Sequence, residues 1–199
     1  MLLPRSAGAT VQDGHFELAE GVGLSGPPAI ADLVRELLPL PTTDGDAITF
    51  QIRDDPALGA EGYHLLVTPS GVTATAATED GLRWAVQSLL QLIPDREPRR
   101  LPCVDVVDRP VYPWRGSLLD VARWCHPMPF IYRYVDLLAM HKLNTLHLHL
   151  TDDQGWRFEV RKYPRLTEIG GFRRESPEGH AREGREDGVP HGVSTPSAS

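Results

Sequence analysis

The sequence predicts an α+β domain over residues 1–110, followed over residues 111–199 by a strand–helix–strand unit whose two strands run parallel. Three observations lead to this fold class. Apolar residues alternate or recur with a helical period in several short segments before residue 94. A stretch with five prolines, Pro94–Pro113, then predicts a stiff connector and places the domain boundary near residue 110. After it, a strand, a helix and a strand follow one another closely, which is typical of a βαβ unit.

The elements of the first domain follow from apolar periodicity and turn chemistry. The turn Pro69-Ser70-Gly71 predicts a hairpin, because proline fixes φ and glycine accepts a positive φ. Residues 1–14 show no period and predict a loose lead-in. We expect the strands and helices of residues 1–110 to close on one another as one layered domain. The predicted elements are a helix over 29–38, strands over 48–52, 62–68 and 72–78, and a helix over 79–93.

In the second domain both predicted strands end on charged residues. Parallel neighbours lie about 4.8 Å apart, so Arg123 and Asp152, which leave the carboxyl ends of the two strands, should emerge side by side on one rim. Pro129 can open the intervening helix, where its missing N–H costs nothing. One face of this helix is predicted to carry Phe130, Ile131, Tyr134, Leu137, Leu138 and His141.

Composition excludes several classes of protein. The formal net charge of −7 argues against nucleic acid as a partner. No apolar run approaches the ~20 residues that a membrane span needs, so we expect no membrane partner. Residues 1–10 lack the apolar core of a secretory signal, and two cysteines are too few for a disulfide framework. A cytoplasmic location is the expectation.

Several motifs occur in an order and spacing that resemble family 20 glycoside hydrolases, the β-N-acetylhexosaminidases. The resemblance implies that residues 1–110 are the small accessory domain of this family and residues 111–199 an incomplete beginning of its (β/α)8 TIM barrel. A full barrel takes roughly 250 residues, so we expect a truncated product. The motifs of the second part are Trp114-Arg115-Gly116, Asp120-x-x-Arg123, Lys142-Leu143-Asn144, His147 to Arg157, and Tyr163 to Gly170. The accessory domain is indicated by Glu61-Gly62-Tyr63, the hairpin and Leu82-x-Trp84-x-Val86-Gln87-x-Leu89, residues that a generic α+β domain explains nearly as well.

The resemblance assigns substrate-binding roles to Arg123 and Asp152. Arg123 corresponds to the arginine that binds sugar hydroxyls in the −1 subsite, and a guanidinium fork suits two vicinal hydroxyls. The other reading of Arg123 is an arginine paired with a surface carboxylate. Asp152 corresponds to a residue that orients the site through a histidine from a later segment. Asp153 could contribute to the site or cap the next loop.

Two further groups of residues have alternative readings. His147 and His149 lie on the strand face opposite the leucines and, with Asp152, could form a metal site. Because a third ligand at a convincing spacing is missing and the family needs no metal, we predict no metal or other cofactor and place His149 behind the sugar-binding residues. Trp156 could stack on a sugar or cap the barrel mouth.

The implied reaction is hydrolysis of terminal non-reducing N-acetylhexosamine from β-N-acetylhexosaminides by substrate-assisted retaining catalysis. The implied partner is thus an N-acetylhexosamine-containing oligosaccharide or glycoconjugate. The family uses an adjacent Asp-Glu pair on the fourth barrel strand, and the printed sequence contains no Asp-Glu dipeptide. We therefore expect no catalytic residue within the chain. The alternatives are a non-catalytic carbohydrate-binding or interaction fragment and, third, a metal-dependent hydrolase.

Overall fold

The computed structural model describes residues 2–94, 96 and 98–172 and divides into two compact units. The first unit comprises Met1–Pro113 and Met140–Lys142, and the second comprises Trp114–Ala139 and Leu143–Ser199. The charged segment 172–188, which the sequence predicts to be either a long solvated loop or a disordered stretch, lies outside the described residues apart from Phe172, and so do residues 189–199.

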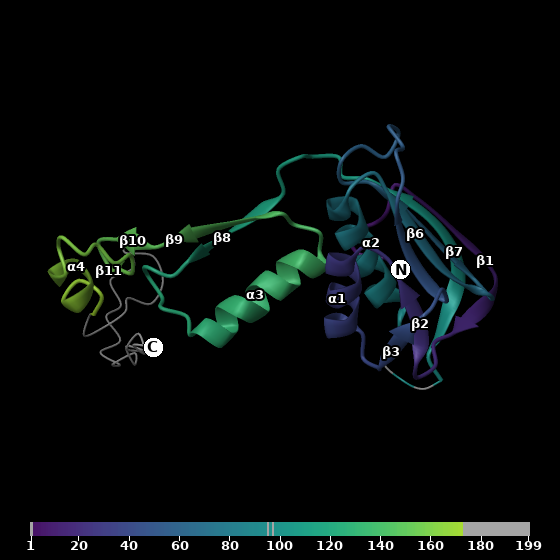
Figure 1. Cartoon of the computed structure of the whole chain (residues 1–199). Coiled ribbons are helices and arrows are strands. Elements are labelled where there is room, and N and C mark those ends of the chain that lie inside the picture. Colours follow the sequence, from purple (N-terminus) through teal and green to yellow (C-terminus); the bar gives the residue numbers. More distant parts are fainter. Residues whose placement is uncertain (1, 95, 97, 173–199) are drawn as a thin grey trace. The chain divides into compact units, whose positions relative to one another are not determined.

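The first unit is a mixed sheet of seven strands in the order β1-β7-β5-β6-β4-β2-β3. Neighbouring strands are antiparallel in the half of the sheet formed by β1, β7, β5 and β6. Neighbouring strands are parallel in the other half, from β6 through β4 and β2 to β3. Helices α1 and α2 lie side by side on one face of this sheet (Figure 1). The elements are β1 (Gly8–Glu17), β2 (Val22–Ser25), α1 (Pro28–Leu37), β3 (Thr42–Asp44), β4 (Ile48–Ile52), β5 (Tyr63–Thr68), β6 (Gly71–Ala76), α2 (Glu79–Leu92) and β7 (Arg100–Asp108).

The predicted hairpin and both predicted helices of this unit are confirmed. Strands β5 and β6 pair antiparallel with Thr68 opposite Gly71, so the turn lies where the sequence predicts it. Along β5 every second residue is buried, which places one face of the strand against the helices. Helix α2 begins at Thr78, whose side chain accepts hydrogen bonds from the backbone N–H groups of Asp80 and Gly81.

Two predictions for this unit are wrong. The second half of the lead-in expected over residues 1–14 belongs to the edge strand β1, and the connector over Pro94–Pro113 contains β7, which lies between β1 and β5. Strand β1 has no apolar period that would predict it, because almost all its side chains are exposed. In β7, Pro102 is opposite His15, next to an irregularity in the β1–β7 register, where a missing N–H interrupts little of the ladder.

The core of the first unit lies between the sheet and its two helices. Close packing there depends on Gly81 of α2, where an added Cβ would lie 2.4 Å from the Gly62 carbonyl oxygen. Cys103 of β7 is also buried, at 1 % exposure. The largest fully buried side chains of this core include Tyr63, Phe50, Ile30, Ile48, Leu65, Leu82, Leu89 and Leu101.

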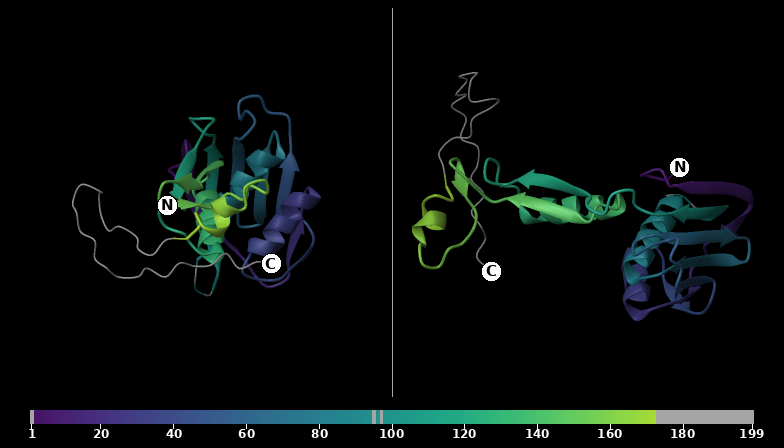
Figure 2. Two further views of the ribbon diagram at one scale, coloured as in Figure 1. Left: turned by 90° about the vertical axis from the view of Figure 1, so that its left-hand side faces the viewer. Right: turned by 90° about the horizontal axis from the view of Figure 1, so that it is seen from above.

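The second unit contains the predicted βαβ arrangement. Strands β8 and β9 pair in parallel, with Gly116 opposite Thr145 and Asp120 opposite His149, which confirms the predicted strand direction. Figure 2 shows the two strands running alongside helix α3. Of the six residues predicted to share one face of α3, Phe130 is 42 % exposed and His141 lies beyond the helix end. The elements are β8 (Gly116–Asp120), α3 (Met128–Met140), β9 (Thr145–His149), β10 (Thr151–Asp152), β11 (Gly155–Trp156) and α4 (Arg165–Glu168).

A hydrogen bond joins α3 to strand β8. The hydroxyl groups of Ser117 in β8 and Tyr134 in α3 lie 2.6 Å apart.

Among the described residues, no helix combines the length and apolar character needed to cross a bilayer.

Candidate sugar-binding site

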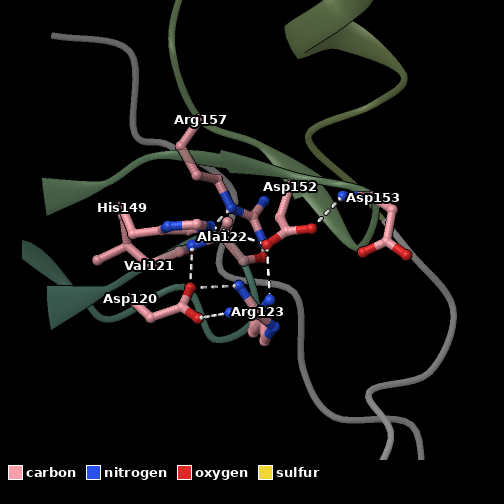
Figure 3. Close-up of polar contacts among 8 residues, drawn as sticks. All are labelled: Asp120, Val121, Ala122, Arg123, His149, Asp152, Asp153 and Arg157. Carbon is pink, nitrogen blue, oxygen red and sulfur yellow. Dashed lines mark hydrogen bonds and ion pairs between the residues drawn. The ribbon is translucent and has the colours of Figure 1, made fainter. Parts of the chain in front are cut away.

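The carboxyl ends of β8 and β9 bring Arg123 and Asp152 together, as their positions in the sequence predict. The Nη2 atom of Arg123 donates to Oδ2 of Asp152 at 2.7 Å (Figure 3). This pairing across 29 residues of sequence exists because the two strands are parallel neighbours. The Arg123 side chain remains 56 % exposed, so its guanidinium is reachable from solvent.

Asp120, the last residue of β8, holds both the backbone and the side chain of Arg123. Its Oδ1 atom accepts hydrogen bonds from the backbone N–H groups of Ala122 and Arg123 at 3.0 and 2.9 Å. Its Oδ2 atom accepts from Nη1 of Arg123 at 2.5 Å. Figure 3 shows the guanidinium lying between the carboxylates of Asp120 and Asp152. The site therefore contains a carboxylate to which the sequence alone assigned no role.

The charges of this cluster stabilise one another. Partial burial acts to raise the pKa of Asp120, but the backbone N–H and guanidinium of Arg123 outweigh it, so this pKa lies below its usual range. The hydrogen bond to Asp120 and the charge of Asp152 raise the pKa of Arg123. At neutral pH the guanidinium is thus a fixed cation between two anions.

His149 and Asp153 both contact Asp152, each in a different way. The Nε2 atom of His149 lies 2.8 Å from Oδ2 of Asp152, and the backbone N–H of Asp153 donates to Oδ1 at 2.8 Å. The Asp153 N–H, followed by the His149 imidazole, lowers the pKa of Asp152 to about 2. The Asp153 side chain is exposed. His149 therefore acts on Arg123 through a shared carboxylate.

Arg157 fixes the backbone of the loop that follows β8. Its guanidinium donates to the carbonyl oxygens of Val121 and Ala122 at 3.1 and 3.4 Å, and also to the carbonyl oxygen of Gly171. Val121 and Ala122 are buried, whereas Arg123 immediately after them is exposed. By binding the backbone of this loop, Arg157 keeps Arg123 at the rim.

Trp156 of β11 pairs with Thr151 of β10 and lines a cavity together with Asp152 and Asp153. Its indole N–H donates to the carbonyl oxygen of Phe158 at 2.5 Å, which fixes the ring. The cavity has a volume of about 710 Å³ and is lined by Asp152, Asp153, Trp156, Tyr163 and other residues of the segment up to Gly170. This position leaves both readings of Trp156, sugar stacking and closure of the barrel mouth, as predictions.

The described part of the chain contains no arrangement of side chains that could hold a metal ion. In residues 2–94, 96 and 98–172, no group of three or more His, Cys, Asp and Glu side chains is placed to hold a metal ion. His147 is exposed on β9.

The sequence identified four of the residues that meet here, namely Arg123, His149, Asp152 and Asp153, and missed two. Asp120 could have been found from its i, i+3 spacing to Arg123 at a strand end, where a short carboxylate can cap its own turn. Arg157 has no such local signal, because its partners lie 14 to 36 residues away in the sequence.

The two parts of the chain match models of two domains of one protein family. Residues 1–109 match the family model described as glycosyl hydrolase family 20, domain 2, and residues 112–189 match that of the family 20 catalytic domain. The chain belongs to glycosyl hydrolase family 20.

Curated relatives agree with this membership over most of the chain. A β-hexosaminidase of Akkermansia muciniphila is 37 % identical over 174 residues, which are 83 % of this chain and 34 % of that protein. A β-N-acetylhexosaminidase of Cellulomonas fimi is 38 % identical over 146 residues, which are 69 % of this chain and 29 % of the relative. The chain thus spans about a third of the length of these curated relatives.

Solved structures show the same relation. The N-acetyl-β-hexosaminidase of Streptomyces plicatus matches with a TM-score of 0.79 and 32 % identity, over 90 % of this chain and 40 % of that chain. The exo-β-N-acetylglucosaminidase of Vibrio harveyi, solved with N-acetylglucosamine, matches with a TM-score of 0.76 and 32 % identity, over 85 % of this chain and 28 % of that chain.

Proposed function

We propose that this chain supplies the accessory domain and the first part of the sugar-binding rim of a β-N-acetylhexosaminidase. The enzyme would release terminal non-reducing N-acetylhexosamine from β-N-acetylhexosaminides with retention of configuration, using the acetamido oxygen of the substrate as nucleophile. Arg123 and Asp152 are the proposed substrate-binding residues, and His149, Asp153 and Trp156 support or line the site. Support comes from family membership and from relatives whose names and bound ligands concern N-acetylhexosamines.

The observation that carries the proposal is the Arg123 guanidinium, exposed at the rim and fixed by ion pairs to Asp120 and Asp152. Such a fork presents N–H donors in a rigid plane, and two of its nitrogens are already oriented by carboxylates. A sugar hydroxyl that meets this guanidinium finds a donor that needs little reorganisation. Preorganisation of this kind suits recognition of a neutral polyol.

The sign of the local charge also favours a neutral ligand. Three carboxylates, those of Asp120, Asp152 and Asp153, act on the one guanidinium of Arg123. An anionic ligand would approach this excess of negative charge unfavourably, whereas a hydroxyl group can accept from the guanidinium and donate to a carboxylate. The excess of negative charge therefore favours sugars over phosphates and nucleic acids as ligands of the rim.

Binding to the 199-residue chain provides the test. Saturation-transfer NMR with N-acetylglucosamine should give a signal that Arg123→Ala abolishes, while the matched control Arg133→Ala, an exposed arginine of α3, retains it. A signal that survives Arg123→Ala would contradict the assignment of Arg123. Fusing the chain to the remaining part of a family 20 sequence and assaying a chromogenic N-acetyl-β-glucosaminide then tests the activity itself.

One observation favours a second candidate, a non-catalytic carbohydrate-binding or interaction fragment. The printed sequence contains no Asp-Glu dipeptide, so it offers no adjacent pair of general acid and acetamido-orienting carboxylate. Sugar binding by the chain without turnover in the fusion would support this candidate against the enzyme.

A further inference from the structure

The first unit contains a cluster of buried polar side chains, one of which comes from far outside residues 1–113. Tyr63 of β5, Ser88 of α2 and Asp108 at the end of β7 have relative exposures of 1, 0 and 8 %. The fourth member, Lys142, is 7 % exposed and lies in the turn after α3. A buried ammonium is uncommon and needs a compensating partner.

Every polar group of the cluster has a close partner. The Nζ atom of Lys142 donates to Oδ2 of Asp108 at 2.8 Å and to the Tyr63 hydroxyl at 2.7 Å. The Tyr63 hydroxyl lies 2.5 Å from Oγ of Ser88 and donates to Oδ2 of Asp108 at 3.1 Å. The same ammonium lies 4.9 Å from the centre of the Tyr63 ring, within the range of a cation–π contact.

The carboxylate of Asp108 is the anchor of the cluster. Its Oδ1 atom accepts from the backbone N–H groups of Ala7 and Arg109, each at 3.0 Å. The two backbone amides and the Tyr63 hydroxyl are neutral donors, so a cation must balance the negative charge of Asp108. The Nζ atom of Lys142, 2.8 Å from Oδ2 of Asp108, is that cation. Removing one partner from such a buried pair leaves an uncompensated charge, which is strongly destabilising.

Burial also shapes the proton affinities of the cluster. It lowers the pKa of Lys142, and the hydrogen bond and charge of Asp108 oppose this shift. Burial raises the pKa of Tyr63 far above its ordinary value, so the phenol keeps its proton at neutral pH. The phenol can therefore accept from the ammonium and still donate.

The backbone of Lys142 gives independent evidence that this side chain is required. Its φ of 58° is left-handed, and the N–H of Leu143 bonds to the carbonyl oxygen of Leu138 at 2.9 Å, as in a Schellman helix end. Glycine is the usual residue there, because a Cβ disfavours this conformation. A lysine in this position accepts backbone strain, which its buried contacts must offset.

We propose that the Asp108–Tyr63–Ser88 cluster is a socket for the ammonium of Lys142, and that the accessory unit is complete only when the turn after α3 fills it. The partner of this surface is thus a segment of the same chain, Met140–Lys142, which the structure already groups with Met1–Pro113. Residues 1–110 are then not the self-sufficient domain that their sequence pattern predicts. The inference does not depend on the proposed sugar chemistry.

The first experiment uses the small number of lysines. The sequence has two, Lys142 and the exposed Lys162, so acetylation of the native chain followed by peptide mass spectrometry compares them directly. Lys142 should react at least ~10-fold more slowly than Lys162, because reaction requires local opening. Asp108→Asn should remove much of this protection. Equal rates for the two lysines in the unmodified chain would overturn the proposal.

The second experiment separates the socket from simple helix capping, because the two readings predict opposite signs. If Lys142 only ends α3, Lys142→Gly should stabilise the chain by relieving the left-handed strain. The proposal predicts that Lys142→Gly and Lys142→Met each lower hydrogen-exchange protection in β5, α2 and β7, by about 100-fold. The control Lys162→Met should leave these elements unchanged. Unchanged or increased protection with Lys142→Gly would refute the socket.

A double substitution completes the test. In Lys142→Met with Asp108→Asn neither charge remains, so the combined loss of protection should be smaller than the sum of the two single losses. Additive losses would show that the two side chains act independently and would overturn the proposal.

Discussion

Asp120 is the residue whose replacement most directly tests how the rim positions Arg123. Replacing Asp120 by alanine removes an acceptor from the backbone N–H groups of Ala122 and Arg123 and from the Arg123 guanidinium. Replacing it by asparagine keeps an acceptor oxygen for the backbone but points an amide donor or a neutral oxygen at the guanidinium. The two variants therefore separate the turn from the arginine.

The magnitudes follow from the hydrogen bonds that each variant loses. Two backbone N–H groups without their acceptor resemble a lost helix cap, which typically costs ~1 kcal/mol each, so Asp120→Ala should destabilise the turn by about 2 kcal/mol. Asp120→Asn should lose less than half as much. Both variants release one side of Arg123, and we expect affinity for N-acetylglucosamine to fall roughly 10-fold or more in each, because misplacing a binding group is costly.

Two measurements on the 199-residue chain are needed. Hydrogen exchange of peptides that cover β8 and the residues after it reports the local stability, and NMR titration reports the affinity. The control is Asp136→Asn, which alters an exposed carboxylate on α3 of the same unit. If Asp120→Asn binds the sugar as tightly as the unmodified chain, Asp120 does not position Arg123. Equal stability losses for the two variants would instead refute its role as a backbone acceptor.

Three further predictions concern packing, pH and turnover. Gly81→Ala should lower the Tm of the first unit, because the added Cβ would lie 2.4 Å from the Gly62 carbonyl oxygen and 2.7 Å from the Ala76 Cβ. This clash should outweigh the preference of a helix for alanine over glycine, which is worth ~1 kcal/mol. A raised Tm would contradict the close packing. The Asp152 carboxylate should titrate near pH 2 in NMR, because the Asp153 N–H and the His149 imidazole hold its pKa at about 2. Its contribution to stability is then complete above the unfolded pKa of ~3.9 and is lost as the pH falls through about 2, and a midpoint near 4 would speak against these contacts. The isolated 199-residue chain should show no turnover of a chromogenic N-acetyl-β-glucosaminide above background, because it lacks an Asp-Glu pair. Proton transfer by such a pair typically accelerates the reaction by ~10²–10⁴-fold. Turnover that Arg123→Ala abolishes would show that other residues of the chain replace the missing pair.

Several of the elements that could be predicted from the sequence bury one face and expose the other. Strands β5 and β6 and helices α1 and α2 each bury one face, so their apolar period is visible in a short window. The rim was predictable for a related reason. Strand polarity and a charge at each strand end were enough to bring Arg123 and Asp152 together.

What the sequence could not reveal depends on contacts made across long separations. Strand β1 is an exposed edge, and its pairing with β7 joins residues about 90 positions apart, for example Val11 with Val104. The burial of Lys142 depends on Asp108 and Tyr63, which lie 34 and 79 residues away in sequence. In a linear reading, a lysine between a histidine and a leucine has the features of an ordinary solvated residue. Only the folded sheet shows that it is enclosed.

The two thiols of the chain differ in accessibility in a way that makes the rim open to spectroscopy. Cys103 is buried in β7, whereas Cys125 is only half-buried and follows Arg123 by two positions. A maleimide fluorophore or nitroxide should therefore attach to Cys125 in the native chain and leave Cys103 untouched until the sheet unfolds. One reagent would then place a reporter two residues from Arg123 and would also measure how often the sheet of the first unit opens, without any engineered cysteine.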